Sequence, residues 1–202
     1  MRIRLTPVPA MTLVFAGVLA ALASQATALP AGKQTKIQNC ENAIIDAQQD
    51  FLGKELGVFS TCAKDFLFAN IKDSPAKEAA LAAAQTACVT QLNTLKGASS
   101  TFIDSVIAGC TPAVNLIFTK PSDPTGYQDL LEELGVTDID SVPELAGYLC
   151  ASKTLFAVLI AAYEVPRGSQ LFTNYVTNEL HKSVTAFLDP RCTTVVTPPP
   201  KK

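Results

Sequence analysis

Apolar and small side chains recur every three or four positions along residues 35–70. This spacing is typical of the buried stripe of an amphipathic α-helix. The stripe consists of Ile37, Cys40, Ile44, Ala47, Phe51, Val58, Cys62, Phe66 and Ala69. The pattern stops at Lys72-Asp73-Ser74-Pro75, where Ser74 is a suitable helix cap and Pro75 a suitable first helical residue. A second helix is therefore predicted to begin there.

The second helix has its own stripe, which extends as far as Cys110. Its members are Leu81, Ala84, Cys88, Leu92, Leu95, Phe102, Val106 and Cys110. Gly97 lies inside this stripe, at a point where a helix bends or divides easily. Together the two stripes predict an antiparallel helical hairpin over residues 35–110.

The remainder of the chain predicts a second, smaller helical hairpin. Residues 111–125 are expected to form a loop, followed by a short helix at 127–134. Asp140-Ser141-Val142-Pro143-Glu144 is a helix-start pattern for a helix over 145–165. That helix has almost no polar face, so we expect it in the middle of a bundle. Pro166-Arg167-Gly168 predicts a turn, and 170–188 predicts a last amphipathic helix that ends at Asp189-Pro190.

The six cysteines are arranged symmetrically about the first predicted turn and nearly symmetrically about the second. Cys40 and Cys110 each lie 35 residues from Pro75, and Cys62 and Cys88 each lie 13 residues from it. Residues equidistant from the turn of a hairpin lie level with each other, so the predicted disulfides are Cys40–Cys110 and Cys62–Cys88. Geometry and elimination then pair Cys150 with Cys192. Zinc and thioredoxin-type sites need thiols two to four residues apart, and this sequence has none so close.

Residues 1–28 resemble a secretory signal peptide. Arg2 and Arg4 precede an uncharged run from Met11 to Ala23, and Ala26 and Ala28 form an A-x-A cleavage site. We therefore expect cleavage near Ala28 and a secreted or periplasmic protein. Residues 29–192 are predicted to form one all-α domain, with hairpin 35–110, loop 111–125 and second helical part 126–192. The tail 193–202 is expected to be disordered.

The charge balance argues against nucleic acid as a partner, and the length of the apolar stretches argues against a membrane span. Without Arg2 and Arg4 the chain has 14 basic and 18 acidic residues, a formal charge of −4, which disfavours nucleic acid. The most apolar stretch after the signal is Leu155 to Tyr163, and the charged residues Lys153 and Glu164 bound it. It is too short for a span, so no membrane span is expected after signal removal.

Few residues are suited to catalysis or metal binding. His181 is the one histidine, and no Ser-His-Asp or Cys-His context surrounds it. An acidic stretch lacks the spacing and the glycine of a calcium-binding loop; its members are Asp129, Glu132, Glu133, Asp138 and Asp140. Lys153 is a candidate buried cation, although its stem is able to carry the charge outward to solvent. We expect no cofactor, no metal and no enzymatic activity.

One segment resembles known proteins. Asn39-Cys40-Glu41-Asn42-Ala43-Ile44, followed by Phe51, Lys54, Leu56 and Cys62, is similar to the recurrent Cys-x21-Cys helices of exported bacterial proteins of uncharacterised function. The likeness covers residues 36–110. It implies a fold of disulfide-laddered helices and brings no catalytic residues with it.

Two functions remain open from the sequence. The first is an exported, non-enzymatic structural or protein-binding module. The second is a carrier of a small, lipid-like apolar ligand, held in a cavity between helices. The residues that would line such a cavity, or else fill a dry core, are Phe51, Phe59, Phe66, Phe102, Phe156 and Ile160.

Overall fold

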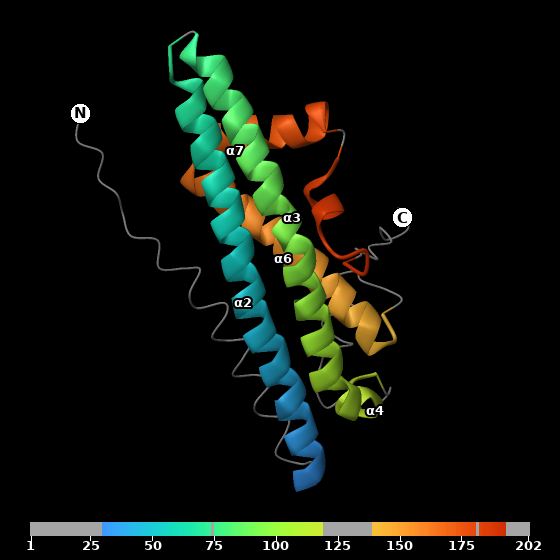
Figure 1. Cartoon of the computed structure of the whole chain (residues 1–202). Helices are drawn as coiled ribbons and strands as arrows, with labels where there is room; N and C mark the ends of the chain where they lie inside the picture. The colour runs from blue at the N-terminus through green and yellow to red at the C-terminus, as the bar shows by residue number, and fades with distance from the viewer. Residues whose placement is uncertain (1–29, 74, 119–138, 181, 193–202) are drawn as a thin grey trace, which may run out of the picture.

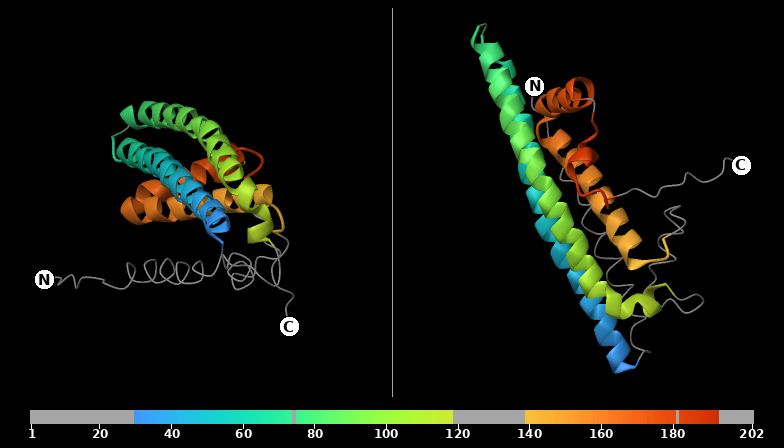
Figure 2. Two further views of the ribbon diagram at one scale, coloured as in Figure 1. Left: turned by 90° about the horizontal axis from the view of Figure 1, so that it is seen from below. Right: turned by 45° about the vertical axis from the view of Figure 1, so that its right-hand side comes forward.

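A computed structural model describes residues 30–73, 75–118, 139–180 and 182–192. The described residues are almost entirely helical and contain no strand, so the predicted all-α class is confirmed. Two long helices form one layer, and the C-terminal elements pack on one side of it (Figures 1 and 2).

The long hairpin is the predicted one. Helix α2 covers Ala31–Asn70 and helix α3 covers Ala76–Cys110, and the two run side by side (Figure 1). Most residues of the two predicted stripes are buried, with Phe51 and Phe102 almost fully enclosed, whereas Ala47, Val58 and Leu81 are only partly buried. Phe59, beside Val58, is fully buried. Helix α3 is not divided at Gly97, because this glycine faces open space and the helical hydrogen bonds continue through it.

The predicted loop at 111–125 is wrong for its first seven residues. Thr111–Ala113 form a 3-10 turn, η2, and Val114–Ile117 form the short helix α4. The helical path continues because Ala113 and Ile117 are fully buried, and because Thr111 Oγ1 donates to the carbonyl of Ile107 at 2.6 Å. The predicted helix 127–134 lies outside the described residues.

Helix α6 covers Val142–Glu164 and begins where the sequence predicts. Ser141 Oγ accepts a hydrogen bond from the Glu144 backbone nitrogen at 3.4 Å. The Glu144 side chain in turn accepts one from the backbone nitrogen of Asp140 at 3.1 Å. These reciprocal bonds satisfy two backbone donors that a helix start leaves unpaired.

The chain after α6 differs from the prediction. The predicted turn residues Pro166-Arg167-Gly168 form the first turn of helix α7, Pro166–Asn174, since the chain already reverses at Val165. Pro166 suits the first position of a helix, where a backbone N–H has no partner to lose.

The predicted helix 170–188 is broken rather than continuous. It passes into a π-helical turn η3, Tyr175–Glu179, and a separate 3-10 turn η4, Val184–Phe187. The break brings the chain back along α6, so that Cys192 reaches Cys150.

All three disulfides join the cysteines that the spacing pairs. The Cα–Cα distances are 4.3 Å for Cys40–Cys110, 5.2 Å for Cys62–Cys88 and 5.3 Å for Cys150–Cys192. The first two connect α2 to α3, and the third fastens the end of the described chain to α6. We call Cys150–Cys192 the third disulfide.

Two glycines allow helices to approach closely. A Cβ atom at Gly168 would overlap the carbonyl oxygen of Ala63, so the start of α7 rests directly on the backbone of α2. A Cβ atom at Gly109 would overlap that of Ala43, across the hairpin. Neither position has room for a side chain.

Candidate functional site

The six residues proposed to line a ligand cavity are not brought together. Phe51 and Phe102 pack with ring centroids 5.3 Å apart, and Phe59 and Phe66 pack against Phe172 of α7. These four side chains are buried and fill the core. The other two lie on α6, where Phe156 is 43% exposed and Ile160 is half-buried. Of the two alternatives left open by the sequence, Phe51, Phe59, Phe66 and Phe102 therefore follow the dry core, because their rings occupy the space between the helices.

Helix α6 buries its small side chains rather than its large ones. Val142 and Leu145 are buried in its first turn, and from there on the buried face consists of Ala146, Gly147, Cys150, Ala151, Thr154, Ala157 and Ala161. Small side chains allow α6 to approach the hairpin closely. The expectation that α6 occupies the middle of a bundle is wrong, because only this small-residue face is covered.

Four large apolar side chains in the second half of α6 point to solvent. Leu155 is 64% exposed, Leu159 59% and Tyr163 89%, and Phe156 lies beside them. Their spacing of three and four residues places them on one face, opposite the buried one. We call these four residues the α6 stripe. Contiguous apolar surface of this kind marks interaction sites more often than chance.

A surface recess adjoins the α6 stripe. It has a volume of about 460 Å³. Its lining, mainly apolar, consists of Tyr148, Ala151, Ser152, Thr154, Leu155, Val158, Val184 and Thr185. The recess thus lies between the outer part of α6 and the η4 turn. It shares Leu155 with the α6 stripe, so the two form one continuous apolar region.

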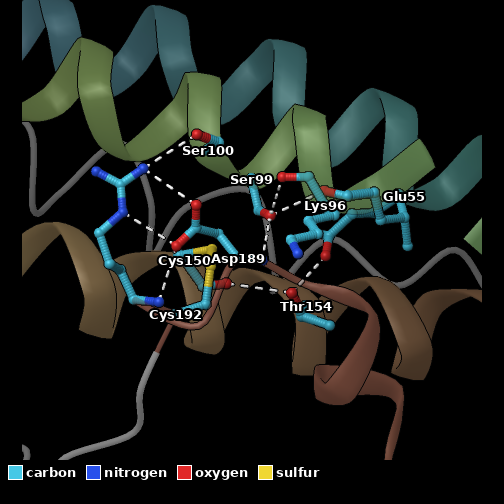
Figure 3. Close-up of a disulfide and its surroundings, with 10 residues drawn as sticks. Glu55, Lys96, Ser99, Ser100, Cys150, Thr154, Asp189 and Cys192 are labelled. Carbon is cyan, nitrogen blue, oxygen red and sulfur yellow. Dashed lines mark hydrogen bonds and ion pairs between the residues drawn. A yellow bond between two sulfur atoms is a disulfide. The ribbon is translucent and has the colours of Figure 1, made fainter. Parts of the chain in front are cut away.

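A buried carboxyl group lies under α6. Glu55 of α2 is fully buried, and its Oε1 is hydrogen-bonded to Thr154 Oγ1 (Figure 3). Its second oxygen, Oε2, has no hydrogen-bond partner among the described residues. Burial raises the pKa of Glu55 to about 8 from an ordinary 4.5, although the hydrogen bond from Thr154 opposes the shift.

The hydrogen bonds of Thr154 agree with a neutral Glu55. Thr154 Oγ1 lies within hydrogen-bonding distance of both Glu55 Oε1 and the carbonyl oxygen of Cys150, at 3.2 Å from the latter. A hydroxyl has only one proton to donate. If Glu55 is protonated, it donates to Thr154 Oγ1, and Thr154 donates to Cys150. Both contacts are then hydrogen bonds, and no unpaired charge is buried.

A second polar cluster holds the end of the described chain on α3. Arg191 pairs with Asp104 at 2.7 Å and with Asp189 at 3.0 Å, and donates to Ser100 Oγ at 3.0 Å. The Asp189 backbone nitrogen donates to the buried Ser99 Oγ at 2.7 Å. The hydrogen bond from Arg191 lowers the pKa of Asp189 to about 2. This cluster and the third disulfide fix the segment Asp189 to Cys192 from two sides.

The remaining sequence candidates do not form a catalytic centre. Lys153 is half-buried on α6, and burial lowers its pKa. His181 and the acidic residues 129–138 lie outside the described residues, while Asp140 donates its backbone N–H to the Glu144 side chain at the start of α6. Within the described ranges, no group of three or more His, Cys, Asp or Glu side chains could hold a metal ion.

Two described stretches meet the length and hydropathy of a membrane span. They are Ala76–Ile117 and Val142–Glu164, which contain 18-residue windows with mean hydropathy 1.3 and 1.7, respectively. Core helices of proteins in water pass the same test. In this fold both stretches carry disulfide cysteines and pack against α2. The sequence argument against a span considered only the nine residues from Leu155 to Tyr163. The apolar window within α6 is 18 residues long, so that argument underestimated its length.

Comparisons with known proteins found no match: no family model, no curated protein and no solved structure is similar to this chain. The resemblance to exported bacterial helices therefore stays a prediction.

Proposed function

We propose that this chain is an exported, non-enzymatic protein that binds another protein through the α6 stripe. The observation that carries the proposal is the inverted order of side chains on α6, with small residues inside and Leu155, Leu159 and Tyr163 outside. Burying those side chains in the core would stabilise the fold by about 1.5–3 kcal/mol each. Their exposure is best explained by a partner that covers them.

The attachment of α6 to the rest of the fold supports a binding role. The third disulfide joins α6 to the segment that Arg191 holds on α3. Ser169 of α7 donates to the α6 carbonyl of Ala161 at 2.9 Å. A surface held in place before binding loses little conformational entropy when a partner docks.

Export is supported by the chemistry of the cysteines. Every cysteine belongs to a disulfide, and such bonds persist in oxidising compartments.

A non-enzymatic role is supported by the surroundings of the polar side chains, which are enclosed or already paired. Glu55 is sealed from solvent, and Arg191 is occupied by two carboxylates.

Photo-crosslinking tests the binding role directly. A photoreactive amino acid replaces Leu159 in the exporting cell, and the matched control replaces Asp46, which is exposed on α2. We expect a discrete crosslinked protein band with the probe at Leu159 and none with the probe at Asp46. Equal or absent crosslinking at both positions would contradict a binding role for the α6 stripe.

The recess beside the α6 stripe favours a second candidate function, the carriage of a small apolar ligand. Its volume of about 460 Å³ lies within the range of small-molecule sites. Native mass spectrometry of the exported protein tests this candidate. A bound mass that leaves on denaturation, and that is lost when Val158→Trp fills the recess, would support it. A bare chain, with no rise in melting temperature across fatty acids and sterols, would refute it.

A further inference from the structure

We infer that the partner covering the α6 stripe is a second copy of this chain, with the two α6 helices packed antiparallel about a twofold axis near Leu159. This inference rests on the proposed function, because it names the protein that the α6 stripe binds. Three features of the stripe carry it: the order of its apolar residues, the order of its flanking charges and its area.

The apolar order is symmetric about Leu159. Leu155 and Tyr163 lie four residues before and after it, on the same face of the helix. In an antiparallel pair centred there, Leu159 meets Leu159 of the second copy. Leu155 of each copy then meets Tyr163 of the other, so every large side chain of the row meets an apolar one.

The flanking charges are complementary under the same symmetry. Lys153 and Glu164 are 11 residues apart, close to three full turns, so they lie on the same edge of the stripe. Their midpoint falls within one residue of Leu159. An antiparallel twofold axis therefore places Lys153 of each copy level with Glu164 of the other. A parallel pair would place like charges level with each other.

Lys153 and Glu164 are both able to form this ion pair between copies. Burial lowers the pKa of Lys153, and a carboxylate of the second copy would favour its charged form. Glu164 accepts one hydrogen bond from Ser60 Oγ at 3.1 Å through Oε2, which leaves its other oxygen for the lysine.

The area of the stripe is adequate for a pair of moderate strength. Its four side chains are 43–89% exposed, and at roughly 200 Å² for each large side chain they offer about 500 Å² per copy. Two copies would bury about 1,000 Å², the lower limit for a specific interface. We therefore expect a dimer that dissociates on dilution.

Sedimentation velocity of the mature protein, with its disulfides intact, tests the pairing over a range of concentrations. The wild type should change from monomer to dimer as concentration rises. Leu159→Asp places two carboxylates at the axis and should weaken the dimer by at least about tenfold. The matched control Ile71→Asp changes a side chain that is 67% exposed at the hairpin tip, and it should leave the dimer unchanged. Circular dichroism confirms that each variant is folded.

Charge exchange tests the antiparallel direction. Lys153→Glu alone and Glu164→Lys alone should each weaken the dimer, and the double exchange should restore it. A dimer that is insensitive to Leu159→Asp, or no recovery in the double variant, would overturn the inference. A monomer at every concentration would also overturn it. If the probe at Leu159 still crosslinked a different protein, the proposed function would stand without the dimer.

Discussion

Glu55 should make the stability of this protein depend on pH in the range where most proteins are insensitive. Its pKa is about 8 in the fold, against 4.5 for an ordinary glutamate. The folded state therefore holds a proton that the unfolded chain releases. A group whose pKa is raised by folding stabilises the fold fully below the unfolded pKa, and this contribution is lost as the pH rises through the folded pKa. Between pH 4.5 and 8 the loss is roughly 1.4 kcal/mol per pH unit, with a ceiling of about 5 kcal/mol.

Glu55→Gln isolates this contribution. The amide keeps the shape of the side chain and an N–H that donates to Thr154 Oγ1, as the protonated carboxyl does, but it does not ionise. Urea unfolding at steps between pH 5 and pH 9, with disulfides intact, gives the free energy of unfolding of each variant. Glu78→Gln, at an exposed position of α3, is the matched control.

We expect the wild type and Glu78→Gln to lose stability together as the pH rises. Glu55→Gln should lack this loss and become the most stable of the three at pH 9. Parallel curves for all three proteins would refute the reasoning, because they would show that Glu55 ionises in the fold as readily as in the unfolded chain.

Three further predictions follow from the anchoring of the C-terminal part. Gly168→Ala should destabilise the fold by more than about 1 kcal/mol, because the added methyl group has no room. Gly53→Ala adds its methyl group in open space and should stabilise the fold by up to about 1 kcal/mol. Thermal unfolding measures both effects. Replacing both cysteines of the third disulfide by serine should cost about 4 kcal/mol by the chain-entropy estimate for a 42-residue separation, as measured by urea unfolding. Arg191→Ala should return the pKa of Asp189 from about 2 toward its ordinary 3.8, and a carboxyl NMR titration would detect the change. An unchanged Asp189 titration would show that Arg191 does not hold this carboxylate.

The long hairpin was predictable because helix geometry leaves it little freedom. A fixed rise per residue makes positions equidistant from the turn level with each other, and Cys40–Cys110 and Cys62–Cys88 are such positions. The place of Glu55 was also readable in principle. It lies four residues after Phe51 and four before Phe59, within the buried stripe, and a charged residue at such a position signals a buried carboxyl.

The orientation of α6 was not predictable from hydrophobicity, because both of its faces are apolar. The signal that distinguishes them is size, since Ala146, Cys150, Ala157 and Ala161 recur at helical spacing on the buried face. The break in the helix after α7 was harder to predict from the sequence. The residues 170–188 have a helical pattern, but the third disulfide requires the chain to turn back toward Cys150. That long-range constraint outweighs local propensity.

The orientation of α6 also gives the third disulfide a structural role. Beyond Leu145 the buried side chains of α6 are mostly small, and each of them buries little apolar area. The third disulfide, the Glu55–Thr154 hydrogen bond and the Ser169–Ala161 hydrogen bond hold α6 where burial alone would not. A partner that covers the α6 stripe would add the missing burial. If that partner is a second copy, the melting temperature should rise with protein concentration in the wild type and stay constant in Leu159→Asp.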